Sequence, residues 1–190
     1  GASIVPVGGG LSNAQPLIAW LDAAVRARVL RRCTDPVVVP ARHRIEPGLI
    51  GSAVLRRLEQ AGYRQLITCD RAGLDLTDSP TTNRFFDEYR PEYVILAAGR
   101  VGGIIENLRF PADFIMANLA IQGNVLNAAK RTGVRRLIFF ASSCMYPREC
   151  PQPMAENALL TGQPESTSLS YAIAKLAGMQ TCIANNLQEG

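Results

Sequence analysis

The sequence has few groups that bind metals and no apolar run long enough to cross a bilayer. His43 is its only histidine, and its five cysteines (Cys33, Cys69, Cys144, Cys150 and Cys182) show neither C-x-x-C spacing nor a Cys/His arrangement suited to zinc. We therefore expect no metal site, and unpaired cysteines favour a reducing compartment. Arg, Asp or Pro interrupts each apolar stretch before the roughly 18 residues that a transmembrane helix needs. No transmembrane segment is expected.

The charge of the chain gives little support to a nucleic-acid partner. The 20 basic and 16 acidic residues leave a formal net charge of +4, and the only dense basic run extends from Arg26 to Arg32. We interpret this run as part of a helix packed on the outside of the protein. The alternative is a remnant of an organellar targeting region. The predicted location is the cytoplasm, with a mitochondrion or plastid as the alternative.

Apolar runs alternate with stretches of helical periodicity from Val37 onward. Such alternation predicts βαβ units and an α/β fold, in which helices cover both faces of a doubly wound parallel sheet. The predicted strands are 37–39, 65–68, 93–97 and 137–141, and the predicted helices are 52–61, 82–89, 111–133 and one that begins near Ser170. A polar loop rich in proline is expected over 147–168.

The beginning of the chain does not continue this scheme, so we assign residues 1–35 to an N-terminal extension and residues 36–190 to the main domain. Within the extension, residues 4–7, the glycines at 8–10 and a helix from Pro16 imitate a strand, a glycine turn and a helix. We interpret this unit as a decoy, because Asn13 stands where a third glycine or alanine is expected. The alternative is that it forms the first βα unit.

The turn after the strand at 37–39 is the predicted dinucleotide site. Open α/β sheets bind dinucleotides where glycines let the pyrophosphate approach backbone N–H groups at a helix N-terminus. Gly48 and Gly51 supply the last two glycines of this pattern, while Arg42 stands where the first is expected. The alternative is that both glycines only allow close packing of the helix against the strand.

Two arginines bear on the choice of cofactor. Guanidinium groups near the ribose pair with the 2′-phosphate of NADP, so Arg44 and Arg71 would select NADP over NAD. The alternative is that both side chains are simply solvated. The further cofactor contacts that we predict are Ala97, Ala98, Ser142 and Lys175.

A catalytic group is predicted from two segments of the chain. Tyr171 and Lys175 are four positions apart, which places them on one face of the final helix, where the ammonium can lower the pKa of the phenol. Ser142 follows the strand ending at Ala141, at the sheet edge where ligands of such folds bind. This set suits carbonyl reduction, in which a tyrosine transfers the proton and a serine hydroxyl holds the oxygen. Cys144 is a candidate proton-exchanging thiol, and the alternative is a small buried cysteine.

Five short segments follow one another along the chain. They are V-G-G-I at 101–104, F-P-A-D-F at 110–114, S-S-C-M-Y-P at 142–147, Q-P-M-A-E at 152–156 and Y-A-I-A-K at 171–175. In order and spacing, from about Val37 to Gly190, they resemble the GDP-L-fucose synthase family of extended short-chain dehydrogenases/reductases. The resemblance implies a Rossmann-type domain, NADP(H) as the cofactor and a GDP-sugar, GDP-4-keto-6-deoxymannose, as the substrate.

The resemblance also implies roles for individual residues. Ser142, Tyr171 and Lys175 would form the reductase triad, and Cys144 would be one of two acid/base groups for epimerisation. The nucleotide would be bound by Gly48, Gly51, Arg44 and Arg71. In the family the second epimerisation group is a histidine beyond the segment matched here, and this sequence has no histidine after His43. The elements that hold the GDP-sugar also lie there, so a Rossmann-type domain lacking the C-terminal substrate domain is predicted.

Three departures from the family pattern support a second hypothesis. First, the first glycine of the turn is replaced, and the turn is three residues longer at 45–47. Second, Arg100 stands where the family usually has lysine. Third, the substrate-binding half is not in this sequence. The first hypothesis is an enzyme of the family, as a homo-oligomer or with a partner chain that carries the substrate lobe. The alternative is a non-catalytic, reductase-derived subunit of a larger assembly, with residues 1–35 as an attachment arm.

Overall fold

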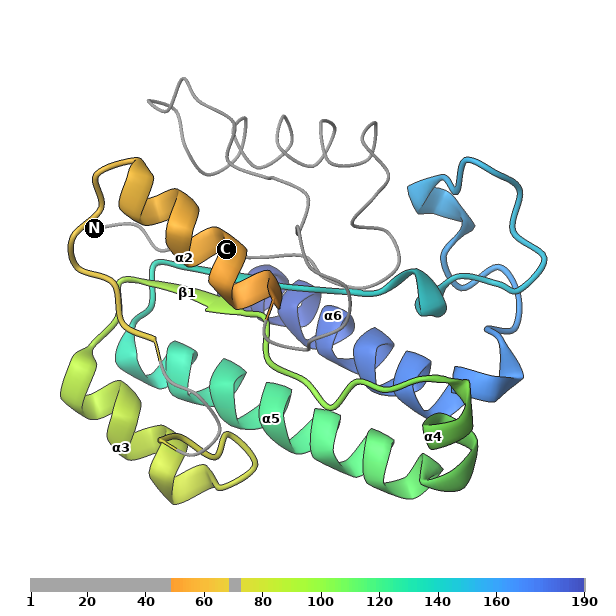
Figure 1. Ribbon diagram of the computed structural model, residues 1–190, viewed down its shortest axis with the longest axis horizontal. Coiled ribbons are helices and arrows are strands. Elements are labelled where there is room, and N and C mark those ends of the chain that lie inside the picture. The colour runs from red at the N-terminus through yellow and green to blue at the C-terminus, as the bar shows by residue number, and fades with distance from the viewer. Residues whose placement is uncertain (1–48, 69–72, 190) are drawn as a thin grey trace. The chain divides into compact units, whose positions relative to one another are not determined.

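A computed structural model describes residues 49–68 and 73–189 (Figure 1). In these ranges the main elements follow in the order α2, α3, β1, α4, α5, β2 and α6. They belong to two compact units, one with α2, β1 and most of β2, and the other with α3, α4, α5 and α6. The predicted extension over 1–35 and the predicted strand over 37–39 lie outside the described residues.

The first unit contains a parallel pair of strands, β1 (Tyr93–Leu96) and β2 (Arg136–Phe139). β1 reads Tyr-Val-Ile-Leu, an apolar run typical of a parallel strand covered on both faces. The predictions of strands over 93–97 and 137–141 are confirmed with slightly different bounds. Helix α2 (Leu49–Gln60) likewise confirms the helix predicted over 52–61.

The prediction of a strand over 65–68 is wrong in the structure, where this segment belongs to neither strand nor helix. Ile67 in its middle is 45% exposed. An extended segment becomes a strand only when a neighbour completes its hydrogen-bond ladder. The first predicted strand, residues 37–39, lies outside the described residues, and apolar composition alone does not make a strand.

In the second unit, local chemistry fixes both ends of α3 (Ser79–Tyr89). The carboxylate of Asp78 accepts a hydrogen bond from the backbone N–H of Thr81 (2.9 Å), and a proline occupies the first turn. At the other end Arg90 adopts the left-handed conformation (φ 43°) and donates to the carbonyl of Phe86. The helix predicted over 82–89 is confirmed and starts three residues earlier.

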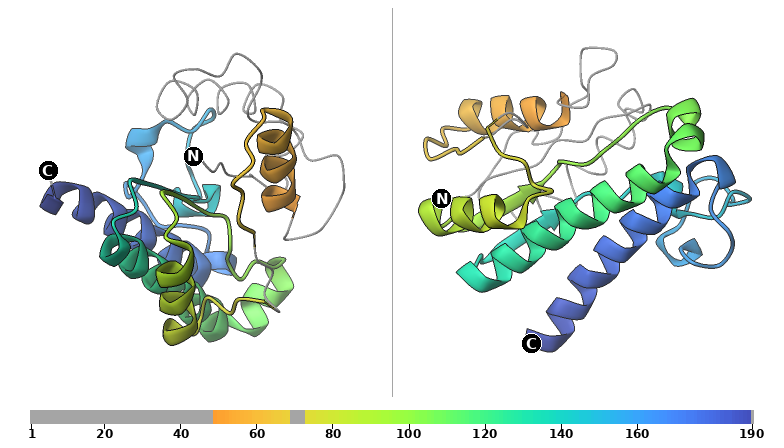
Figure 2. Two further views of the ribbon diagram at one scale, coloured as in Figure 1. Left: turned by 90° about the vertical axis from the view of Figure 1, so that its left-hand side faces the viewer. Right: turned by 90° about the horizontal axis from the view of Figure 1, so that it is seen from below.

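Two long helices, α5 (Pro111–Thr132) and α6 (Leu169–Glu189), pack side by side and run in the same direction (Figure 2). Proline begins α5, and Gly133 ends it with φ 72°, donating to the carbonyls of Ala129 and Lys130. Both helices confirm the predicted ones. The buried apolar residues of this unit are Phe86, Phe114, Val125, Leu126, Ala128, Ala129, Met145, Ala172, Ala174 and Leu176.

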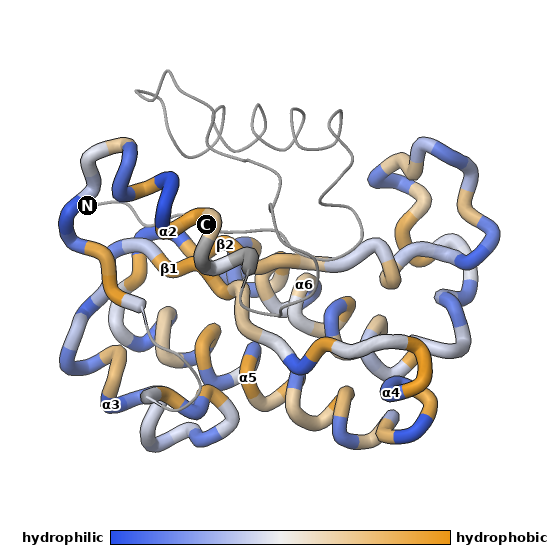
Figure 3. The backbone as a smooth tube through the Cα atoms, viewed as in Figure 1, coloured by the Kyte–Doolittle hydropathy of each residue, from blue (hydrophilic) through white to orange (hydrophobic). Residues whose placement is uncertain are grey.

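A short helix that was not predicted, α4 (Ile104–Arg109), precedes α5. The buried side chain of Asn107 donates to the carbonyls of Gly102 and Gly103, both at 3.1 Å, and so fixes its first turn. Apolar residues make up much of α4 (Figure 3), and Ile105 among them is 76% exposed. Six residues are too few for helical periodicity to be recognised in a sequence.

The segment from β2 to α6 forms the predicted polar loop and contains three single turns of 3-10 helix. These are η2 (Ser143–Met145), η3 (Glu156–Ala158) and η4 (Ser166–Ser168). Among the helices of residues 49–68 and 73–189, none combines the length and the apolar character needed to cross a membrane.

Candidate active site

The side chain of Lys175 in α6 is only 6% exposed. Its Nζ donates to the carbonyl oxygen of Phe140 at 3.0 Å and lies 4.7 Å from the centre of the Phe139 ring. An ammonium has three donors, so this carbonyl uses one of them. Burial lowers the pKa of Lys175 to about 8, because the charged amine loses hydration. The interior of this unit therefore holds one cation beside the chain that leaves β2.

Ser142 and Tyr171 meet at the start of η2. The Ser142 hydroxyl oxygen accepts a hydrogen bond from the backbone N–H of Cys144 at 3.3 Å, which holds the hydroxyl at the turn. The Ser142 side chain is also hydrogen-bonded to Tyr171, whose ring centre lies 5.9 Å from Nζ of Lys175. The structure thus brings together the four predicted catalytic residues.

The pKa of Tyr171 lies above its usual range. Burial is the main cause, since the phenolate would lose hydration; the hydrogen bond with Ser142 acts in the opposite direction, and the nearby Cys144 adds to the rise. We expected the ammonium of Lys175 to lower this pKa. Lys175 is not among the causes of the shift; its Nζ donates to the Phe140 carbonyl and lies over the ring of the tyrosine. The phenol of Tyr171 therefore stays protonated near neutral pH.

The backbone beyond Ala98 passes close to Lys175 and is fixed by Asn118 of α5. The buried Asn118 amide oxygen accepts from the N–H of Arg100 (3.1 Å), and its Nδ2 donates to the carbonyl of Arg100 (2.9 Å). A Cβ at Gly99 would lie 2.8 Å from that amide oxygen and 3.7 Å from Nζ of Lys175. Glycine is needed here for a close approach of the backbone to two polar side chains.

A cavity of about 210 Å³ opens beside Cys144. Its wall includes Tyr146, Arg148, Cys150 and Met154, all from the polar loop. Pro147 forms an isolated antiparallel bridge with Pro164, and the backbone N–H of Arg148 donates to the carbonyl of Gln163 at 3.0 Å. The loop therefore folds back on itself and leaves the Cys144 thiol next to open space.

The other predicted cofactor residues are divided between described and undescribed parts of the chain. Gly51 lies in the first turn of α2 and is exposed, at the helix end where the pyrophosphate is predicted. Ala97 follows β1 and is half-buried, while Ala98 is exposed. Arg44, Gly48 and Arg71 lie outside the described residues. Within the described residues, His, Cys, Asp and Glu side chains form no group of three or more that could hold a metal ion.

The prediction from sequence did not include two polar residues that support this site. Asn118 and Gln122 lie on the buried face of α5, four residues apart, where apolar side chains are the rule. Gln122 donates to the carbonyl of Ala174, next to Lys175, at 2.7 Å. Polar residues in register with the apolar positions Phe114 and Val125 were the available signal, because such positions point to the core.

Comparison with known proteins gives a consistent set of relatives. Residues 47–190 match the model described as the NAD dependent epimerase/dehydratase family. GDP-L-fucose synthase 1 of Arabidopsis thaliana is 50% identical over 143 residues, which make up 75% of this chain and 44% of the relative. GDP-L-fucose synthase of Escherichia coli (strain K12) is 46% identical over 143 residues, with 75% and 44% covered. The chain spans less than half the length of these relatives.

Solved structures show the same fold. GDP-mannoheptose C4 reductase from Campylobacter jejuni, with NADP bound, has a TM-score of 0.70 at 37% identity, over 73% of this chain and 44% of that chain. The GDP-L-fucose synthetase from Naegleria fowleri bound to NADP has a TM-score of 0.67 at 28% identity, with 73% and 44% covered. The fold is therefore the predicted Rossmann-type α/β fold with a doubly wound parallel sheet.

Proposed function

We propose, because this chain belongs to the NAD dependent epimerase/dehydratase family, that it carries the reaction centre of a GDP-L-fucose synthase-like epimerase/reductase. The substrate would be GDP-4-keto-6-deoxymannose and the cofactor NADPH. The observation that carries the proposal is the cluster of Ser142, Cys144 and Tyr171 beside the buried Lys175. The names of the relatives support the choice of substrate class.

The residues around Lys175 fit a nicotinamide cofactor. Two of its three donors are left for acceptors other than the Phe140 carbonyl, and ribose hydroxyls are such acceptors. Gly99 keeps space open, since any side chain there would approach Nζ within 3.7 Å. When bound, NADPH supplies a hydride to the substrate carbonyl. We assign the remaining nucleotide contacts to Arg44, Gly48, Gly51, Arg71, Ala97 and Ala98.

Tyr171 and Ser142 both interact with the oxygen of the substrate carbonyl. The raised pKa of Tyr171 keeps the phenol protonated, so it can donate that proton to the oxygen as the carbonyl is reduced. The Ser142 hydroxyl donates a hydrogen bond to the same oxygen. Lys175 holds its positive charge nearby, which stabilises the phenolate that the donation leaves behind.

Cys144 serves the epimerisation half of the reaction. A carbon next to a keto group is acidic, and a thiol can take up and return its proton. The cavity beside Cys144 provides the space for a sugar ring at this thiol. The second acid/base group and the lobe that holds the GDP-sugar would be supplied by polypeptide outside this sequence, consistent with the 44% of the relatives' length that is covered.

The same proposal includes an assembly and a compartment. Exposed apolar side chains on α6, with Ile173 at 43%, Ile183 at 42% and Leu187 at 80%, favour a homo-oligomer or a larger assembly. We place it in the cytoplasm, with an organelle as the alternative, and keep residues 1–35 as an extension to a domain of residues 36–190.

The second candidate is a non-catalytic, reductase-derived subunit of a larger assembly. It is favoured by Arg42, which stands where the first glycine of the dinucleotide turn is expected. In this case NADP(H) would be a structural ligand or would not bind.

One experiment separates the two candidates. The full chain is incubated with GDP-4-keto-6-deoxymannose and NADPH carrying deuterium at the transferable position, and the sugar product is examined by NMR. The enzyme hypothesis predicts deuterium on the former carbonyl carbon, because hydride transfer delivers it there. Formation of no deuterated sugar, by the chain alone and in its native assembly, would favour the structural subunit.

A further inference from the structure

Two of the three free cysteines among the described residues line one small cavity. Cys144 belongs to η2, and Cys150 follows the turn at 148–149 in the same loop. Both residues contribute to the wall of the cavity of about 210 Å³, and both are half-buried. The third free cysteine, Cys182, lies in α6 and does not contribute to this wall.

The path of the loop brings the two cysteines to the same space. Pro147, midway between them, is bridged to Pro164, and the N–H of Arg148 bonds to the carbonyl of Gln163. The chain then reverses direction at 148–149 and returns to the cavity at Cys150. The ion pairs that Arg148 makes in this loop are exposed, so breaking them costs little free energy. A disulfide between the two cysteines needs their Cα atoms within about 7 Å of each other.

We propose that Cys144 and Cys150 form a reversible intramolecular disulfide that closes this cavity. The oxidant is a low-molecular-weight disulfide such as oxidised glutathione. The thiolate of one cysteine attacks a sulfur of the oxidant and releases one glutathione thiol; the thiolate of the other then attacks the mixed disulfide and releases the second. The S–S bond of glutathione breaks, the Cys144–Cys150 bond forms, and the two electrons and two protons leave with two molecules of reduced glutathione.

The functional consequence rests on the proposed function. In the disulfide Cys144 has no proton to exchange, so epimerisation stops. Ser142, Tyr171 and Lys175 lie outside the disulfide and keep their contacts with one another. The oxidised protein would therefore lose proton exchange at the carbons beside the keto group while the reduction centre stays chemically intact.

Peptide mapping tests the bond without substrate or cofactor. The full chain is treated with oxidised glutathione, blocked with an alkylating reagent and cut with trypsin, which separates Cys144 and Cys150 because Arg148 lies between them. We expect peptides 137–148 and 149–175 to be joined, and dithiothreitol to separate them. Cys182→Ser should leave the joined pair unchanged, and Cys150→Ser should abolish it. Glutathione on both cysteines without a joined pair, or a bond from either to Cys182, would overturn the proposal.

A second measurement follows proton exchange from solvent deuterium into the keto-sugar. Oxidation is expected to reduce this exchange at least about tenfold, with recovery in dithiothreitol. In Cys150→Ser oxidation can leave only a mixed disulfide of Cys144 with glutathione, so any loss of exchange there should come with glutathione on Cys144 and without joined peptides. Loss of exchange in the oxidised wild type without the joined peptides would contradict the regulatory role. If the joined peptides form but neither protein exchanges protons, the disulfide stands and the proposed function fails.

Discussion

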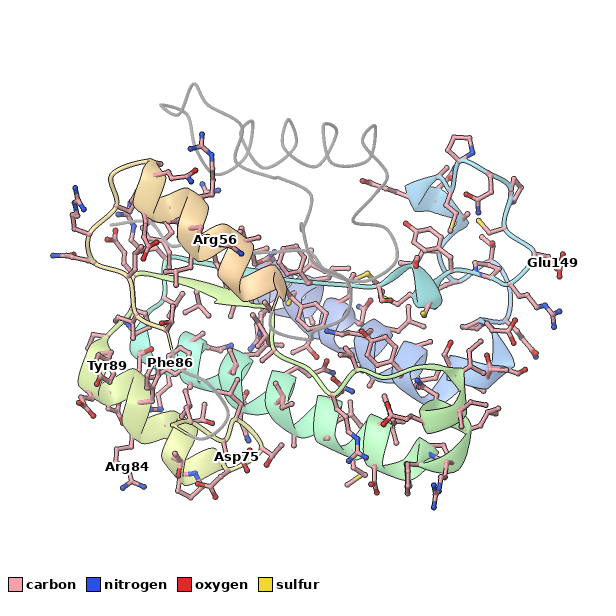
Figure 4. All side chains as sticks on the ribbon, in the orientation of Figure 1. Arg56, Asp75, Arg84, Phe86, Tyr89 and Glu149 are labelled. Atoms are coloured by element: carbon pink, nitrogen blue, oxygen red, sulfur yellow. The ribbon has the colours of Figure 1, made fainter. Side chains whose placement is uncertain are left out.

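The interface of α5 and α6 and the loop over 147–165 hold the two halves of the candidate site in different ways. In the interface, the polar side chains of Asn118, Gln122 and Lys175 are buried, and each is bonded to a backbone carbonyl. In the loop, backbone hydrogen bonds are few, and Arg148 pairs with exposed carboxylates such as Glu149, which projects into solvent (Figure 4). We therefore expect the interface to be more rigid than the loop.

The difference matches the chemistry assigned to each region. Proton donation by Tyr171 needs a fixed distance to the reacting oxygen, and buried hydrogen bonds provide such order. The cavity beside Cys144 has to admit and release a ligand, and an exposed loop can do this at small energetic cost. Substitutions in the interface should therefore have large effects on activity or on the free energy of unfolding, and substitutions in the loop should have small effects.

The largest effect is expected for Tyr171→Phe. The substitution keeps the buried ring and removes the proton donor, so we expect reductase kcat to fall by about 10²–10⁴-fold with little change in stability. Steady-state kinetics with GDP-4-keto-6-deoxymannose and NADPH, with urea unfolding as the control, measures this. A variant that retains more than half of the activity would remove Tyr171 from the mechanism.

Lys175→Met should stabilise the protein in a pH-dependent manner. The pKa of Lys175 falls from 10.5 to about 8 on folding. Below about pH 8 the buried ammonium therefore destabilises the folded wild-type protein, and this destabilisation disappears as the pH rises from about 8 to 10.5. The substitution also removes the hydrogen bond to the Phe140 carbonyl, which offsets part of the effect. The net increase in the free energy of unfolding at about pH 7 is on the order of 2 kcal/mol.

Urea unfolding of both proteins over this pH range measures the effect. The stability difference should be largest near neutrality and should shrink as the pH passes through the interval from about 8 to 10.5. A difference that does not change with pH would show that burial does not lower the pKa of Lys175.

Two glycines in the paired helices should respond in opposite directions. A Cβ at Gly178 in α6 would lie 2.5 Å from the Phe139 ring and 2.6 Å from the amide oxygen of Gln122, so Gly178→Ala should cost about 1–3 kcal/mol. At Gly123 in α5 a Cβ has no neighbour within 4 Å, so Gly123→Ala should stabilise by about 0.5–1 kcal/mol. Thermal unfolding of both variants and the wild type measures these effects. Equal effects would argue against close packing at Gly178.

The smallest effect is expected in the loop. Arg148 lies 3.4 Å from Glu165 and 3.5 Å from Glu149, and its side chain is 67% exposed. Because water screens such pairs, Arg148→Ala should change the free energy of unfolding by less than about 0.5 kcal/mol. A decrease of more than about 1 kcal/mol in the free energy of unfolding, measured with urea, would mean that the loop is more rigid than we infer.

The sequence predicted what depends on local pattern. Proline at the start of α5 and glycine at its end gave the bounds of that helix, and the four-residue spacing of Tyr171 and Lys175 gave their shared face. The apolar run at 93–96 predicted a strand, in which Leu96 is buried and the other three residues are half-buried. Each of these properties is set by residues close in the sequence, so no knowledge of tertiary contacts is required.

What the sequence could not predict depends on distant partners. The direction of the Tyr171 pKa shift results from burial, which is a property of the folded chain. Asn118 bonds to Arg100, and Cys150 shares a cavity with Cys144, only because loops and helices meet in three dimensions. The segment over 65–68 has the composition of a strand, but strand pairing depends on a neighbour far along the chain.

The most direct test of the account is a fluorescence titration of the full chain with NADPH, with NADH and the Lys175→Met variant measured in parallel. If the buried ammonium holds the ribose of a nicotinamide cofactor, NADPH binds saturably and more tightly than NADH, and the variant binds it at least about tenfold more weakly. Absence of NADPH binding by the full chain, or equal binding by the variant, would contradict the assignment of this site to a nicotinamide cofactor.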